Sequence, residues 1–467
     1  MNKCIMKRLK SICMAACVGI GLIQIYYALL WAFQNGTNIQ DFYDTAIYME
    51  NAVLQSGDGW RLMGYSVVLR PFLAMQDMLG DYFIIPLYIV QALISLLCFA
   101  QGFKTFGRIV SGKEIKYVSM LLPAVYILTV PIVWQMQFAV LPDALCVALV
   151  VLLFSKLAEC MWDSENMHWD SMLIILGCLL MLSMLHRHYF YGAFLLGAVC
   201  GLIVLFRSIH KKYRRKENFL LAGSLILCIF ISAGLSVSVN SKMHNEESYV
   251  EYSLAADLWD GFIYPNIRED YSYYPETVRE VLPVECVEQY GDFYERYMTY
   301  IAPVIAEASP ENTEKIFIQM VETGIAIHKE EMVTGLCKEG ISYALLPVAM
   351  IKYMYFNGNS LYGHNLVKMY ETNPDLTLDY MHIGMNGFAV VSVLGILMYA
   401  AEFVSNKSAR YNRVLILLYG ILGIMVMMLP FMILTVIRFD YRYGLFPAFI
   451  WGTMALLSIY ETENKTV

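Results

Sequence analysis

Charged residues are scarce in this chain of 467 residues. Asp, Glu, Lys and Arg make up 16% of the sequence, against about 25% in a typical soluble domain, while hydrophobic residues make up 58%. The apolar residues fall in runs of roughly 20, the length that a helix needs to cross the hydrocarbon core of a bilayer. This composition excludes a soluble globular domain and predicts a polytopic membrane protein.

Zinc-ligand patterns are absent from the sequence. It contains no CxxC motif and no cluster of His and Cys, so a zinc site is not expected. Nine of the 11 Cys lie in or beside apolar runs or near the N-terminus, where Cys behaves as a small apolar residue. Cys286 and Cys337 are the exceptions. Both a disulfide in an oxidising compartment and two buried thiols are compatible with their positions.

The N-terminal segment has no small-x-small cleavage site, and its apolar stretch is longer than that of a signal peptide. We therefore expect an uncleaved first span. The chain also lacks an internal repeat, which counts against transporter folds built from repeated halves.

We predict an all-α polytopic membrane protein with about ten transmembrane helices. Lys and Arg cluster before the first span and after the second, sixth and eighth spans. Because basic residues are retained on the cytoplasmic side, ten spans place both termini in the cytoplasm of a cell-membrane protein. The predicted spans are residues 12–33, 82–103, 117–134, 140–157, 171–186, 189–206, 219–239, 381–403, 413–436 and 443–460.

These spans divide the chain into three parts: a seven-span module (1–239), an extracytoplasmic, Tyr-rich domain (240–380) and a C-terminal three-span block (381–467). Segment 240–380 carries 23 acidic and 9 basic residues, and its net charge of −14 leaves +7 for the rest of the chain. An acidic outer face argues against a nucleic-acid partner.

Helices are also expected outside the spans. In the first outer loop (34–81), "DTAIYMENAVLQSG" and "GYSVVLRPFLAMQDML" are too short to span and predict two juxtamembrane helices. The extracytoplasmic domain is expected to be mostly helical. Segment 340–356 is apolar enough for an eleventh span, but such a span would move the basic residues 407–413 outside. We expect it to pack on the membrane face.

The few charges beside the spans gather at their predicted outer ends. Charge inside a membrane is costly and usually functional, and the deep parts of the spans are nearly free of it. A carboxylate can act as general base, and arginines can hold a leaving phosphate through bidentate bonds. These residue types suit glycosyl transfer from a phosphate-linked lipid. The group comprises Asp41, Asp44, Asp143, His186, Arg187, His188, Arg438, Asp440 and Arg442.

Four motifs resemble the GT-C superfamily of integral membrane glycosyltransferases, in particular the bacterial branch of protein O-mannosyltransferase-like and aminoarabinose-transferase-like enzymes. "YDTAIYMENAVLQSG" and "GYSVVLRPF" resemble its first-loop pattern, with Ser66 in place of a Pro. "VLPDALCVALVVLLF" resembles the acidic start of the fourth span. "LHRHYFYG" resembles the Arg-containing turn before the sixth span, without the usual Pro and Glu. "RFDYRYGLFPAF" resembles a late Arg-Tyr-x-x-x-Pro pattern.

The resemblance implies an inverting transfer from a polyprenyl-phosphate-linked sugar to a cell-envelope glycan, lipid or wall polymer, among membrane lipids. It assigns the catalytic base to Asp44, with Asp41 as the fallback and Asp143 in support. A divalent metal at these three residues stays open, since some relatives use one, and no organic cofactor is expected. The expected phosphate-binding residues are Arg187, Arg442 and Arg438, and the supporting residues are Tyr48, Tyr443 and His188.

Other interpretations remain open. Asp41 and Asp44 could be solvated residues that flank a helix. Asp143 could be only a negative charge at a helix N-terminus, where it is favourable to the helix dipole. A transporter or flippase of a surface polymer or lipid-linked glycan, or a non-catalytic envelope-complex scaffold, would also fit a chain with these spans.

Overall fold

Helices form every secondary-structure element in the part of the chain that the structure describes. The structure is a computed structural model. The residues that it describes are 3–37, 39, 43–54, 62–111, 116, 118–162, 169–210, 215–243, 254–263, 266–290, 301–347, 349, 374–405, 410–434 and 441–460.

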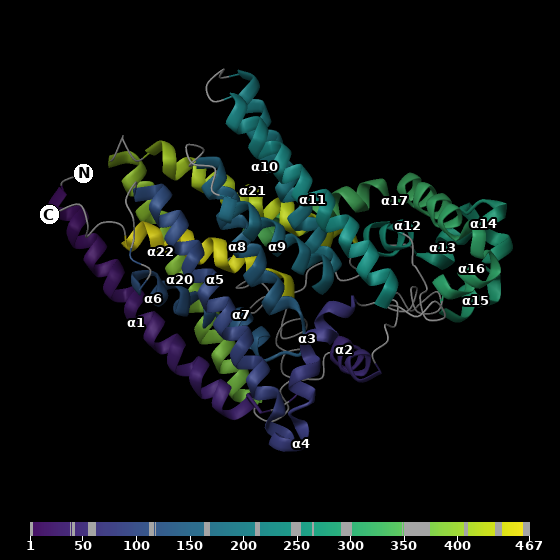
Figure 1. The fold of residues 1–467 in the computed structure, drawn as a ribbon, viewed down its shortest axis with the longest axis horizontal. Coiled ribbons are helices and arrows are strands. Elements are labelled where there is room, and N and C mark those ends of the chain that lie inside the picture. The colour runs from purple at the N-terminus through teal and green to yellow at the C-terminus, as the bar shows by residue number, and fades with distance from the viewer. Residues whose placement is uncertain are drawn as a thin grey trace.

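Six helical segments of the described chain are long and apolar enough to cross a membrane, which confirms an all-α, membrane-embedded protein. They pack side by side, and the start of α1 lies at the same end of the bundle as the end of α22 (Leu445–Tyr460) (Figure 1). The six segments are α1 (Lys3–Asn35), α5 (Ile85–Ser111) with the preceding α4 (Gln76–Leu79) and η1 (Gly80–Ile84), α8 (Asp143–Trp162), α10 (Arg187–His210), α20 (Pro374–Ser405) and α21 (Arg410–Leu434).

Three further predicted spans coincide with shorter apolar stretches, which lie in α9 (Trp169–Leu185), α11 (Arg215–Met243) and α22. The remaining predicted span, over 117–134, is bent rather than one straight helix, and its crossing of the membrane stays a prediction. That segment forms α6 (Val118–Leu128) and α7 (Pro131–Gln137), which meet at 87°. Val130 is extended, with ψ at 130°, because the proline that follows it disfavours the helical conformation.

Side chains from other helices satisfy the backbone at this bend. Gln24 of α1 donates its Nε2–H groups to the Tyr126 carbonyl at 2.8 Å and to Thr129 Oγ1 at 3.1 Å. The Tyr380 hydroxyl of α20 donates to the Thr129 carbonyl. Within a bilayer no water is available to these groups, so irregular backbone requires such partners.

Glycines allow the closest approaches between helices. A Cβ atom on Gly395 of α20 would lie 2.3 Å from the Cα atom of Ala455 in α22, and one on Gly192 of α10 would lie 2.9 Å from the Met427 carbonyl oxygen of α21. These pairs bring backbone against backbone, as is common between membrane helices.

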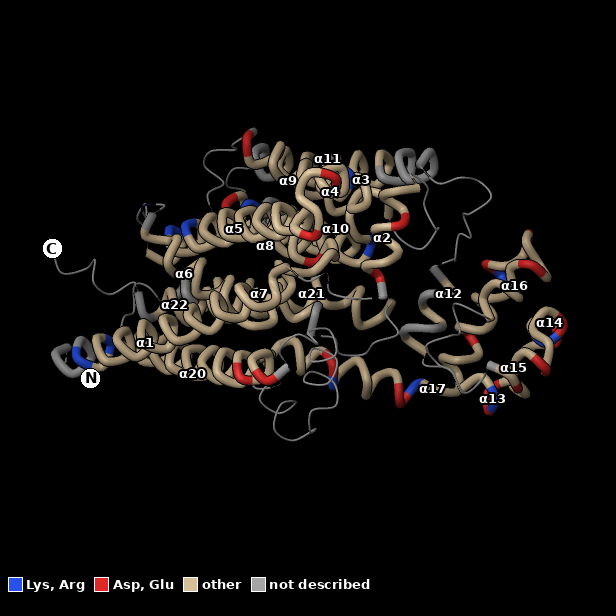
Figure 2. The backbone as a smooth tube through the Cα atoms, turned by 90° about the horizontal axis from the view of Figure 1, so that it is seen from below, with Lys and Arg blue, Asp and Glu red and all other residues tan. Residues whose placement is uncertain are grey.

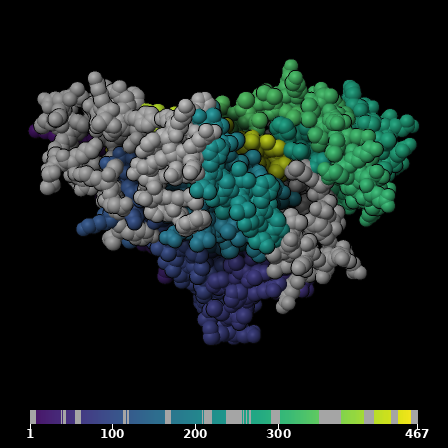
Figure 3. Space-filling view, turned by 45° about the horizontal axis from the view of Figure 1, so that its top comes forward, coloured from purple at the N-terminus to yellow at the C-terminus, as the bar shows by residue number. Residues whose placement is uncertain are grey.

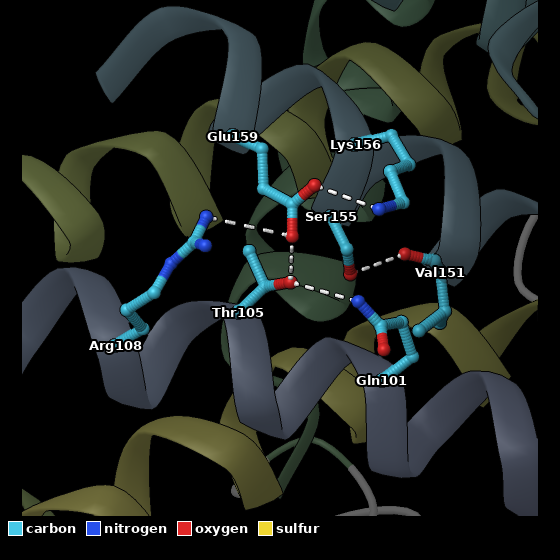
Figure 4. A network of polar contacts seen from close by, with 7 residues as sticks. All are labelled: Gln101, Thr105, Arg108, Val151, Ser155, Lys156 and Glu159. Atoms are coloured by element: carbon cyan, nitrogen blue, oxygen red, sulfur yellow. Dashed lines mark hydrogen bonds and ion pairs between the residues drawn. The ribbon is translucent and has the colours of Figure 1, made fainter. Parts of the chain in front are cut away.

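Charge is nearly absent from the middle of the bundle and gathers at helix ends and over α13 (Ile267–Asp270), α14 (Glu276–Val281), α15 (Val284–Tyr290) and α16 (Ala302–Ala308) (Figure 2). One polar network lies between the last turns of α5 and α8 (Figure 4). Glu159 accepts from Lys156 Nζ at 2.7 Å and from Thr105 Oγ1 at 2.9 Å, and it lies 3.6 Å from Arg108. Glu159 lies 16 residues along α8 from Asp143, about 24 Å at 1.5 Å per residue, so this network is at the opposite end of the bundle from Asp143.

Residues 254–332 contain a second hydrophobic cluster, separate from that of the bundle, which includes Trp259, Phe317 and Met320. These residues belong to a lobe beside the bundle (Figure 3). Cys286 and Cys337, in this lobe, are both free thiols. The lobe consists of α12 (Leu254–Leu258), η2 (Trp259–Ile263), α13 (Ile267–Asp270), η3 (Tyr271–Tyr273), α14 (Glu276–Val281), α15 (Val284–Tyr290), α16 (Ala302–Ala308), η6 (Pro310–Asn312) and most of α17 (Thr313–Ala344).

The structure places α17 over the first part of the segment 340–356, up to Ala344. Trp451 Nε1 of α22 donates to the Ala344 carbonyl at 2.8 Å. Residue 348 and residues 350–356 lie outside the described residues, so the insertion of this segment stays a prediction.

We predict that Gly395→Ala destabilises the protein, because the new methyl group would overlap the backbone of Ala455. Overpacking of this kind costs about 1–3 kcal/mol. The midpoint of thermal unfolding in detergent micelles should fall. Gly223→Ala is the matched control, since nothing lies within 4 Å of its Cβ position. Equal midpoints for the two variants would contradict the close α20–α22 contact.

We also predict that Glu159→Leu is more harmful than the double change Lys156→Leu with Glu159→Leu. The single change leaves the ammonium of Lys156, whose side chain is 14% exposed, without the carboxylate that it contacts. Breaking a buried pair costs about 3 kcal/mol, and this partly buried pair should lose less, whereas replacing both partners is often nearly neutral. The same unfolding assay should rank the double variant above the single one, and the reverse order would be the contradicting result.

Candidate functional site

Asp143 opens α8 in a buried position, with only 3% of the residue exposed. The hydroxyl of Tyr189, from the first turns of α10, donates to its Oδ1 atom at 3.4 Å. A carboxylate at a helix N-terminus is stabilised by the macrodipole. The carboxylate therefore has both a helix end and a hydroxyl donor beside it.

The turn before Asp143 is held by Gln91 of α5, which is fully buried. Its Nε2–H groups donate to the carbonyls of Gln137 and Ala139 at 2.9 and 3.1 Å. Its Oε1 accepts from the Tyr65 hydroxyl at 3.0 Å. This single amide thus joins the α7–α8 turn to the first outer loop.

The segment 34–81, which the sequence predicts to be the first outer loop, contains α2 (Tyr43–Leu54) and α3 (Met63–Leu73), close to the two positions where short helices were predicted. Ser66 of α3 donates to the Tyr48 carbonyl of α2 at 3.1 Å, and the rings of Tyr48 and Tyr65 meet edge to face at 5.2 Å. Ser66 is fully buried, and its hydrogen bond joins the two helices.

Two contacts attach this helix pair to the bundle. Thr45 Oγ1 of α2 donates to the Val140 carbonyl at 3.5 Å, in the turn that precedes Asp143. On α3, a Cβ atom at Gly64 would lie 2.4 Å from the Met184 carbonyl oxygen of α9, so the two backbones touch. Asp44, beside Thr45, is thereby placed close to the α7–α8 turn.

Burial raises the pKa of Tyr65 well above its ordinary value, and Tyr88, Tyr48 and Asp143 add to the shift through their charges. The phenol of Tyr65 therefore stays protonated and acts as a hydrogen-bond donor to Gln91.

A layer of aromatic and imidazole rings lies beside Asp143. Tyr189 contacts Phe431 of α21 at a centroid distance of 4.8 Å, and Phe431 contacts Tyr443 at 4.3 Å. Tyr443 belongs to η7 (Tyr441–Gly444). His188 lies 5.6 Å from Phe431, and His186 lies 5.2 Å from Tyr189. The layer joins the start of α10, the end of α21 and the chain before α22.

The structure thus connects four of the predicted site residues through direct neighbours. Tyr48 contacts Tyr65, which donates to Gln91, and Gln91 in turn donates to the carbonyls of the turn before Asp143. Tyr189 links Asp143 to Phe431, which contacts both His188 and Tyr443 in the same ring layer. Ordered along this path, the predicted residues are Tyr48, Asp143, His188 and Tyr443.

The contacts described above do not include the other predicted site residues. Asp44 is partly exposed in the first turn of α2, and Arg187 is partly exposed at the start of α10. The backbone of Arg442 lies in η7, next to Tyr443, but its side chain is outside the described part. Asp41 and Arg438 lie outside the described residues, so their roles stay predictions.

A metal site at the carboxylates is not formed by the described residues alone. Among them no group of three His, Cys, Asp or Glu side chains has an arrangement that could hold an ion. Asp41, the third carboxylate of the predicted set, is outside the described chain.

Four residues of this region were missed in the sequence: Tyr65, Gln91, Tyr189 and Phe431. Tyr65 and Tyr189 each stand inside a motif that was singled out, within three residues of Ser66 or Arg187. Gln91 could have been found in the sequence, because it is a polar residue within an apolar run. No feature of the sequence marks Phe431, because the run around it is apolar throughout.

We predict that Gln91→Leu destabilises the α7–α8 turn. It removes the donors to two buried carbonyls and the acceptor for Tyr65, and each buried polar group left unsatisfied costs about 1–3 kcal/mol. The unfolding midpoint in detergent should fall well below that of the control Gln76→Leu, whose glutamine is exposed at the start of α4. An unchanged midpoint for Gln91→Leu would rule out this role of the amide.

Comparison with known proteins assigns no family and no function to the chain. No protein-family model, no curated protein and no solved structure matches the chain. The likeness of its motifs to the GT-C superfamily therefore stays a prediction from the sequence.

Proposed function

We propose that the protein is an inverting membrane glycosyltransferase of the GT-C type, which moves a sugar from a polyprenyl phosphate to a cell-envelope acceptor. The observation that carries the proposal is the contact of Thr45 with Val140. It brings α2, which carries Asp44 in its first turn, against the turn that precedes the buried Asp143. Asp44 and Asp143, which are about 100 residues apart in the sequence, are thereby brought to the same end of the bundle.

We further propose that all ten predicted spans cross the cell membrane with both termini in the cytoplasm. Each of the ten ranges coincides with a helix or with the bent pair α6–α7. The start of α1 and the end of α22 lie at one end of the bundle, as an even number of spans requires (Figure 1). Asp44 and Asp143 would then face the outside of the cell.

In this mechanism Asp44 is the general base and Asp143 supports it. A base must reach the acceptor hydroxyl, and Asp44 is partly exposed whereas Asp143 is 3% exposed. Asp44 takes the proton of the acceptor hydroxyl as its oxygen attacks the anomeric carbon from the face opposite the phosphate. The bond from that carbon to the phosphate oxygen breaks, and polyprenyl phosphate leaves.

Arg187 and Arg442 would hold the phosphate as its charge develops. Guanidinium groups bind phosphate through two parallel hydrogen bonds, which strengthen as negative charge grows. Arg187 begins α10 two residues before Tyr189, whose hydroxyl contacts Asp143. Arg438 is a further candidate for this task. Tyr48, Tyr443 and His188 would support these groups from the ring layer and from α2.

One observation favours a second candidate, a transporter or flippase of a lipid-linked glycan. Broken membrane helices are common at transport sites, and α6 and α7 meet at 87° inside the bundle. The two functions are separable, because transfer forms a new glycosidic bond in detergent solution, where transport across a membrane cannot occur.

The test is transfer from synthetic polyprenyl-phosphate sugars to envelope acceptors by the purified protein. We expect Asp44→Asn to lower the rate by about 100-fold or more, the usual contribution of a general base. Asp77→Asn is the matched control, since Asp77 is exposed on α4, which follows the same outer loop. The control should keep the parent rate.

Two outcomes would overturn the proposal. Full transfer by Asp44→Asn would remove the base assignment. Absence of transfer by the parent protein, together with movement of a lipid-linked glycan across vesicles, would favour the flippase.

A further inference from the structure

Helix α17 passes from the lobe to the bundle between Met332 and Leu336. Met332 is buried in the hydrophobic cluster of the lobe, whereas Leu336 packs against the cluster of the bundle. Further along, Tyr343 belongs to the bundle cluster, and Trp451 of α22 donates to the Ala344 carbonyl at 2.8 Å. Figure 2 shows α17 running from the lobe toward the bundle. The end of α17 is therefore part of the surface of the bundle.

Gly340 of α17 lies beside the apolar part of α21. A Cβ atom at this glycine would lie 3.3 Å from Met425 Cε and 3.8 Å from Met432 Sδ. Met425 precedes Leu434, at the end of α21, by nine residues, which is about 14 Å along the helix. Helix α21 is one of the six segments that are long and apolar enough to cross a membrane. Because Gly340 reaches Met425 as well as Met432, this part of α17 lies at the depth of the apolar segment and not beyond its end.

Four exposed side chains form an apolar row along the end of α17. Val333, Ile341 and Leu345 are 55%, 60% and 47% exposed, and Cys337 is exposed as well. Residues four apart in a helix are neighbours on its surface, so these side chains follow one line. Contiguous exposed apolar surface marks a place of contact with a protein or a membrane.

The charged side chains of this part of α17 are compatible with an apolar surroundings for the row. Glu339 is only 5% exposed and lies on the same face as Leu336 and Tyr343, which pack against the bundle. Lys338 is exposed, but side chains of a helix lean toward its N-terminus, which for α17 is the end in the lobe. The ammonium of Lys338 can therefore extend out to lipid headgroups while its methylene groups stay in the apolar region.

We propose that the apolar row is a lipid-binding surface, covered by the acyl chains of the membrane leaflet on the side of the lobe. The row continues an apolar surface that α21 already exposes. Met425, which Gly340 approaches, is 40% exposed, and Leu418, two turns earlier on the same side of α21, is 56% exposed. A helix inserted in this way is stabilised by the apolar area that it buries among acyl chains. Lipid contact thus fixes the position of α17, and with it the lobe, relative to the membrane.

The test measures how strongly oxygen and a water-soluble nickel chelate relax a spin label on the full chain in nanodiscs of one synthetic phospholipid. Oxygen concentrates among the acyl chains, whereas the chelate stays in water. One sample carries the label on the native Cys337, which is exposed. A second carries it on Ile341→Cys in a chain with Cys337→Ser. The Cys337→Ser chain alone gives the signal of any other cysteine, which is subtracted.

We expect oxygen to relax the labels at Cys337 and Ile341→Cys several-fold more strongly than nickel does. Ile318→Cys, also in the Cys337→Ser chain, is the matched control. It replaces the same residue type on the same helix, at a side chain that is 43% exposed and lies next to Phe317 of the lobe cluster. Its label should respond more strongly to nickel. Leu418→Cys on α21 supplies the lipid-facing reference, and its label should respond as that of Ile341→Cys does.

Two results would overturn the proposal. A stronger response to nickel than to oxygen at Cys337 and Ile341→Cys would show that the row faces water. Weak responses to both reagents would show that protein, either a second copy or another part of this chain, covers the row. The label on Cys337 requires no new cysteine and decides the matter even where Ile341→Cys does not fold.

Discussion

Backbone that leaves a helix inside a membrane protein must find its hydrogen-bond partners in the protein itself, and that constraint governs both irregular turns of this bundle. At the α6–α7 bend the partners are Gln24 and Tyr380, and at the α7–α8 turn the partner is Gln91. Each comes from a helix distant in sequence. Neither turn is complete until α1, α5 and α20 are in place, so local conformation here depends on the assembled bundle.

The same constraint connects the first outer loop to the candidate site. Gln91 satisfies the turn before Asp143 with its amide hydrogens and receives Tyr65 of α3 with its oxygen. Since Gly64 brings α3 against the backbone of α9, the outer helices are fixed on two sides. The contacts that place α2 against the turn before Asp143 are thus made by uncharged groups.

The sequence predicted much of the fold, because length and hydropathy alone mark apolar helices. Every predicted span coincides with helix, and both short outer helices lie where their amphipathic patterns indicated. The bend at Val130 was missed although Pro131 signalled it. The contact of His328 with Asp270 could not be predicted, since the two residues are 58 positions apart in the chain.

For the candidate site, residue types and order along the chain nominated Asp143, Tyr48, His188 and Tyr443, which the structure connects through neighbouring side chains. The intermediaries Gln91 and Phe431 were beyond reach, because what distinguishes them is their partner in space. Asp41 and Arg438 lie outside the described residues.

The pair Lys156 and Glu159 has a consequence for how the protein enters the membrane. The two side chains are one helical turn apart on α8 and in direct contact. Helix α8 therefore carries its own counter-charge, and its last turn can leave the aqueous phase as a neutral unit. Arg108 and Thr105 of the earlier helix α5 can then join Glu159 as α8 settles against it. Because the pair neutralises its charges within α8, the free-energy cost of inserting this helix does not depend on the helix against which it later packs.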